Sequence, residues 1–96
     1  MKHLYIFLLV GALSTLSHAT FGQESSNYLE LGLTQNKTGN YADALRNFSL
    51  EIEKNAANPN PTSFYGRGFA KYNLKDFRGA ILDFDKAIEL KPTYFE

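Results

Sequence analysis

Cysteine is absent from the 96-residue sequence, and this absence excludes several kinds of site. Without cysteine there is no disulfide, no thiolate-bound metal and no lipidated N-terminal cysteine. Histidine is nearly absent, because both copies, His3 and His18, lie in an N-terminal segment that we expect to be removed. The remaining chain lacks the commonest general base and the commonest zinc ligand. We therefore expect no enzyme activity, no metal and no cofactor.

An excess of charge of either sign is also missing. The sequence has 10 basic and 10 acidic residues, and removal of the N-terminal segment takes away only Lys2, which leaves 9 basic against 10 acidic residues. A nucleic-acid surface needs clustered lysine and arginine to displace counterions. We therefore expect a protein or peptide partner and no nucleic acid.

Residues 1–22 have the pattern of a secretory signal peptide, with Lys2 ahead of an apolar run over residues 4–13. The small residues near its end predict cleavage after Ala19 or after Gly22. An uncleaved membrane anchor is the alternative, but the run is shorter than the roughly 20 residues that a spanning helix needs. We expect an exported protein, periplasmic or secreted, with no stable membrane span after cleavage.

The chain after residue 24 has helical periodicity and no alternating strand pattern of useful length. Thr38 and Gly39 end one predicted helix, because glycine readily takes the left-handed conformation. Asn40 and Asp76 are expected to cap the helices that follow them, and Pro61 suits a first helical position, where its missing N–H costs nothing. The last helix is expected to bury one face, which consists of Ala80, Ile81, Phe84, Ala87 and Ile88.

The acidic and hydroxyl residues of these helices do not form a recognisable catalytic group. Asp83 and Asp85 are close in sequence, but side chains two apart on a helix point in different directions. We interpret both as part of a solvated face. Ser63 lies near a helix start, where capping is expected rather than nucleophilic chemistry.

An internal repeat relates residues 25–60 to residues 61–96 at an offset of 36. The identical pairs fall at turn and core positions, which indicates one supersecondary unit used twice. These pairs are Gly32 with Gly68, Ala44 with Ala80, Phe48 with Phe84, Ile52 with Ile88, and Glu53 with Glu89.

The second unit resembles the tetratricopeptide repeat, whose pattern is W-x2-L-G-x2-Y, then A-x3-F, then P. The matching places are held by Phe64, Gly68, Ala80, Phe84 and Pro92. The leucine and tyrosine places are held by Arg67 and Lys71, which we expect to pack through their aliphatic stems.

The first unit carries the same pattern less completely. It has Tyr28, Leu31, Gly32, Ala44 and Phe48 in place. Ala56 stands where the closing proline is expected, and Glu51 stands where a small residue is expected.

The resemblance implies an all-α fold of tandem helix-turn-helix repeats, a right-handed α-solenoid with two units over residues 23–92. We place the units at about 25–58 and 61–94, with residues 93–96 as the start of a further repeat or a tail. In this family the first helices line a concave groove that holds proteins or peptides. The residues expected to line that groove are Leu29, Leu33, Tyr65, Phe69 and Tyr72.

Two functions are open at this point. The first is an exported protein–protein interaction module that binds its partner in this groove. The alternative is a structural fragment of a longer repeat array, which assembles with further repeats or with itself and has no separate ligand. A family subset grips C-terminal carboxylates with Lys, Asn and Arg, but here those places hold Leu29, Leu33, Tyr65 and Phe69, so this clamp is not expected.

Overall fold

The computed structural model describes residues 27–95, and this part of the chain is helical with no strand. It contains a helix over residues 27–38, called the 27–38 helix below, followed by α2 (Tyr41–Lys54), α3 (Pro61–Asn73), α4 (Phe77–Leu90) and the short 3-10 helix η1 (Pro92–Phe95). The expected all-α fold is confirmed. The predicted signal peptide lies outside the range described.

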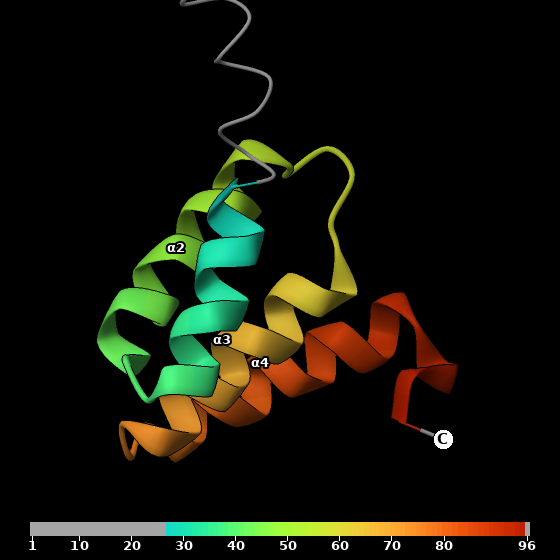
Figure 1. The fold of residues 1–96 in the computed structure, drawn as a ribbon. Helices are drawn as coiled ribbons and strands as arrows, with labels where there is room; N and C mark the ends of the chain where they lie inside the picture. Colours follow the sequence, from blue (N-terminus) through green and yellow to red (C-terminus); the bar gives the residue numbers. More distant parts are fainter. Residues whose placement is uncertain (1–26, 96) are drawn as a thin grey trace, which may run out of the picture.

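The helices form two hairpins stacked on one another. Figure 1 shows the 27–38 helix beside α2, and α3 beside α4. Helix α3 packs against both α2 and α4, so it joins the first hairpin to the second. This arrangement is that of an all-α helical repeat.

Most of the predicted helix ends are confirmed. Gly39 has a positive φ of 84° and closes the 27–38 helix. The Asp76 carboxylate accepts a hydrogen bond from the Gly79 backbone N–H at 3.0 Å and caps α4. Pro61 occupies the first turn of α3, where Asn60 supplies the cap.

The predicted cap at Asn40 is wrong. Its side chain accepts no hydrogen bond from α2, and its amide nitrogen instead donates to Thr38 Oγ1 at 3.3 Å. The side chain is thus turned back toward the preceding helix, so it cannot reach the free N–H groups of α2. Ser63 does not cap α3 either, because it is buried and its hydroxyl donates to the Glu51 carboxylate.

The core is organised around the fully buried ring of Phe48 on α2. Gly32 and Gly66 contact this ring from the 27–38 helix and from α3; a Cβ added to Gly32 would lie 2.9 Å from the ring, and one added to Gly66 would lie closer still. The second hairpin repeats half of this arrangement, since Gly68 lies against Phe84. Only glycine leaves room for a ring this close to a helix backbone.

The predicted buried face of α4 is only partly correct. Ala80 and Ala87 are buried, whereas Ile81 and Ile88 are 59% and 42% exposed. Among α2, α3, α4 and η1, helix α4 contacts α3 and η1, and the outer side of its apolar face remains exposed.

The interpretation of Asp83 as solvated is also wrong, while Asp85 is exposed as expected. Asp83 is buried because two cations from α3 surround it. Arg67 donates to both carboxylate oxygens at 2.9 and 2.8 Å, and Lys71 Nζ lies 3.0 Å from Oδ2. The cations at the leucine and tyrosine places of the repeat pattern are therefore paired with an acid on the partner helix.

Candidate functional site

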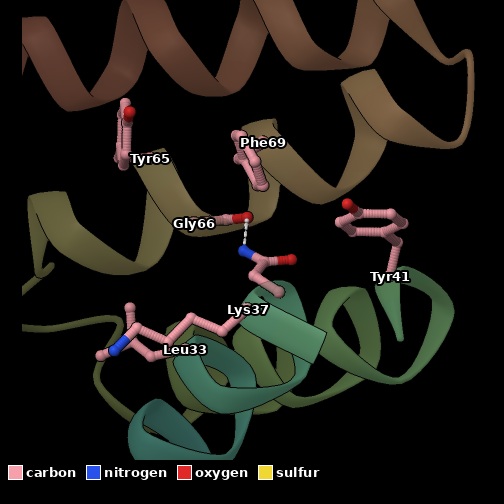
Figure 2. Close-up of a pocket in the computed structure, with 7 residues that line it drawn as sticks. Leu33, Lys37, Tyr41, Tyr65, Gly66 and Phe69 are labelled. Atoms are coloured by element: carbon pink, nitrogen blue, oxygen red, sulfur yellow. Dashed lines mark hydrogen bonds between the residues drawn. The ribbon is translucent and has the colours of Figure 1, made fainter. Parts of the chain in front are cut away.

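A cavity of about 600 Å³ opens between the 27–38 helix and α3, the first helices of the two hairpins. One hydrogen bond fixes these helices relative to each other, from Asn36 Nδ2 to the Gly66 carbonyl oxygen at 2.9 Å. Figure 2 shows this bond at the centre of the site. The lining residues are Leu33, Asn36, Lys37, Tyr41, Tyr65, Gly66 and Phe69.

Aromatic rings form the apolar walls and are held by other rings. Tyr41 and Phe69 meet edge to face with their centroids 6.1 Å apart, and Tyr65 packs against Phe84 at 5.7 Å. Tyr65 is still 36% exposed and Phe69 38% exposed. Each ring therefore combines a packed side, which restricts its motion, with a solvent-exposed side. Such rings can contact a ligand at little cost in conformational entropy.

The structure brings three of the five predicted groove residues together. Leu33, Tyr65 and Phe69 line the cavity. Leu29 instead packs against the buried core around Phe48. Tyr72 is 55% exposed and lies outside the cavity, against the Phe77 ring at 5.3 Å.

Sequence reasoning missed four of the lining residues. Asn36 and Lys37 follow Leu33 by three and four positions, so helical spacing alone could have placed them on the same side of the 27–38 helix. Tyr41 is the first residue of α2, so it reaches the cavity from a second helix, whereas groove residues were predicted only on first helices. Gly66 lacks a side chain, and it reaches the site through the carbonyl group that accepts from Asn36.

Residues 61–94 match the family model of the tetratricopeptide repeat. The matched segment contains α3, α4 and the start of η1. Repeats of this family generally mediate protein–protein interactions and are not themselves catalytic. No solved structure matches the chain.

The hairpin that precedes this repeat has the same packing, with Gly32 against Phe48 where the repeat has Gly68 against Phe84. The cavity thus lies between the first helices of two similar hairpins, the place where the family resemblance puts the groove.

The polar groups of the cavity are few. Lys37 is the only charged lining residue, and it forms no ion pair with any other residue in the range 27–95. Asn36 Oδ1 is buried and accepts no hydrogen bond, although its amide nitrogen is bonded. Asp43, two positions after the lining residue Tyr41, pairs with Arg46 at 3.0 Å.

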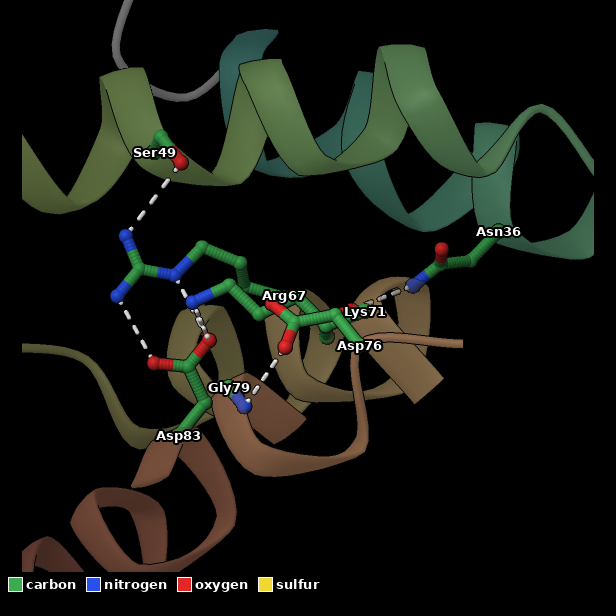
Figure 3. Close-up of polar contacts among 8 residues, drawn as sticks. Asn36, Ser49, Arg67, Lys71, Asp76, Gly79 and Asp83 are labelled. Carbon is green, nitrogen blue, oxygen red and sulfur yellow. Dashed lines mark hydrogen bonds and ion pairs between the residues drawn. The ribbon is translucent and has the colours of Figure 1, made fainter. Parts of the chain in front are cut away.

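The buried charges of the repeat lie elsewhere and are satisfied internally. Figure 3 shows Arg67 extending from Asp83 toward Ser49, whose hydroxyl oxygen lies 3.4 Å from Nη1. Glu51 accepts hydrogen bonds from Ser63 and from Asn55 Nδ2. Because these groups have partners, they serve packing between the helices and are not available to a ligand.

No group of three or more acidic or histidine side chains among residues 27–95 could hold a metal ion. None of the helices there is long and apolar enough to cross a bilayer.

Proposed function

We propose that the protein is an exported interaction module that binds a protein or peptide in the groove between the 27–38 helix and α3. The observation that carries this proposal is the cavity of about 600 Å³, whose walls are partly exposed aromatic rings held by neighbouring rings. Its size lies within the range of about 300 to 1,000 Å³ that is typical of ligand pockets. The family match supports a protein or peptide as the ligand.

The test is a selection of displayed peptides on the purified chain, followed by affinity measurements on two phenylalanine variants. Phe69→Ala removes a groove wall, whereas Phe77→Ala removes a similarly exposed ring outside the cavity. We expect Phe69→Ala to lower the affinity for selected peptides roughly tenfold and Phe77→Ala to leave the affinity unchanged. Equal effects of the two variants, with both folded, would show that binding occurs elsewhere.

Export rests on the sequence pattern of residues 1–22 and has its own test. Intact mass of the protein produced in a secreting host is expected to correspond to a chain that starts at Thr20 or Gln23. A product that retains Met1 would contradict export, while the proposal of peptide binding in the groove would remain.

The alternative function, assembly with further repeats, is favoured by one observation. Helix α4 exposes Ile81, Leu82 and Ile88 on its outer side, and a repeat array buries such a face beneath its next unit. Appending a third repeat would then raise the melting temperature and reduce self-association measured by light scattering. An unchanged melting temperature would show that the two hairpins already form a closed domain.

A further inference from the structure

We propose that the groove selects an extended peptide segment in which a bulky apolar side chain stands two positions from an acidic side chain. The apolar group enters between Leu33, Tyr65 and Phe69, and the carboxylate pairs with Lys37. This inference rests on the proposed function and adds the chemistry of the ligand.

The charge of the groove is unbalanced, and this sets the sign of the preferred ligand. Among residues 27–95, Lys37 is the only charged residue that lines the cavity, and no acidic residue in that range pairs with it. The cations of α3 differ from it, because Arg67 and Lys71 both pair with Asp83. A carboxylate on the ligand is therefore attracted to the groove, and an ammonium group is repelled.

The position of Lys37 sets the spacing between the two ligand groups. Leu33 and Lys37 lie about one turn apart on the same helix, with their backbones separated by about 6 Å along its axis. Figure 2 shows the Lys37 side chain running beside Leu33, at the edge of the apolar wall. In an extended peptide, side chains two positions apart point to the same side and are about 6 to 7 Å apart. One such pair can reach the apolar wall and the ammonium group together.

The probes are acetylated and amidated octapeptides, which carry no terminal charge. The reference sequence is Gly-Ser-Glu-Gly-Phe-Gly-Ser-Gly, and its relatives carry Gln or Lys in place of Glu, or Ala in place of Phe. Binding is followed by NMR titration of the purified chain to millimolar peptide. We expect the Glu peptide to bind about threefold tighter than the Gln peptide and roughly tenfold tighter than the Lys peptide, because exposed ion pairs are weak.

The matched variants are Lys37→Glu and Lys75→Glu, which change the net charge equally at exposed positions. Lys75 lies outside the cavity lining. We expect Lys37→Glu to reverse the order, so that the Lys peptide binds best, and Lys75→Glu to keep the original order. Melting temperatures near that of the parent would show that both variants are folded.

The outcomes separate this inference from the proposed function. If the three Phe peptides bind alike, or if Lys37→Glu and Lys75→Glu shift their order equally, the charge preference is wrong and the apolar groove stands. A preference for the Lys peptide in the parent chain would indicate cation binding on the tyrosine faces and would also overturn the inference. If the Phe peptide binds no better than its Ala relative, both proposals fail.

Discussion

At the scale of single residues, the closest packing is that of Phe48 against two glycines. A Cβ at Gly66 would overlap the Phe48 ring, so Gly66→Ala forces the ring or the helix to move. We expect a loss of about 1 to 3 kcal/mol in the free energy of unfolding, measured by urea denaturation.

The control for this substitution is Gly39→Ala. Gly39 has a positive φ, but an added Cβ there would meet nothing within 4 Å. Its cost is expected to be backbone strain alone, about 1 kcal/mol. A Gly66→Ala variant as stable as the parent chain would contradict the packing described for Phe48.

The buried carboxylate of Asp83 gives a second prediction. Asp83→Asn keeps the shape but leaves Arg67 and Lys71 without a negative partner, so we expect a loss of about 3 kcal/mol by urea denaturation. The matched variant replaces all three residues, with Arg67→Met, Lys71→Met and Asp83→Leu. Because apolar groups can replace a complete ion cluster, this variant is expected to regain most of the loss. If it is as unstable as Asp83→Asn, the cluster contributes more than mutual neutralisation.

Residue identity alone could not place these side chains correctly. Arg67 and Lys71 could be assigned to family positions from spacing, but their common partner, Asp83, lies on another helix and is defined only by helix packing. The same is true of Ser63, which turns toward Glu51 on α2 instead of capping its own helix. The cap at Asp76 was predicted correctly, whereas Asn40, at the same place before α2, donates to Thr38 instead of capping its helix.

At the scale of the helix, α3 divides its surface among three neighbours. Gly66 and Ala70 face the core, Gly68 faces α4, and Tyr65 and Phe69 face the cavity. The helical period predicted that Tyr65 and Phe69 lie on a different side from Gly68, but no prediction placed Gly66 and Ala70 in the core. It could not show that Tyr72, one turn beyond Phe69, rests on Phe77 at the start of α4.

The two tyrosines of α3 therefore give a third prediction. Tyr65→Ala is expected to make the binding free energy of a groove-bound peptide less favourable by about 1 to 2 kcal/mol, because it removes a wall of the cavity. Tyr72→Ala is the matched control and is expected to have a smaller effect, because Tyr72 does not line the cavity. Isothermal titration with a selected peptide measures both. A larger effect at Tyr72 would place the ligand nearer the turn between α3 and α4.

At the scale of the whole molecule, the 36-residue offset between the two units allows a test of whether one copy of the chain can stack on another. Within one copy, Phe48 of the first unit lies against Gly66 of the second unit. If a second copy followed as the next two units, the equivalent contact would place Phe84 of the first copy against residue 30 of the second. The residue there is Glu30, and a side chain at this position leaves no room for the ring. We therefore expect no head-to-tail growth of this chain, despite the exposed face of α4.

Substitution at this position gives the fourth prediction. Glu30→Gly creates the missing space, so light scattering is expected to show association that increases with protein concentration. Glu30→Gln removes the charge but keeps the bulk, and it is expected to remain like the parent chain. Equal association of the two variants would mean that charge, rather than space, prevents stacking.

The single ring of Phe48 also couples the opening of one hairpin to the opening of the other. When the first hairpin opens, the ring leaves Gly66, and α3 loses its contact on that side. The amide protons of α2 and α3 are therefore expected to exchange with solvent deuterium at one common free energy of opening, instead of one value for each hairpin. In a repeat array this corresponds to strong coupling between neighbouring units. The two hairpins are therefore expected to behave as one cooperative folding unit, so that the groove between them is lost when either one opens.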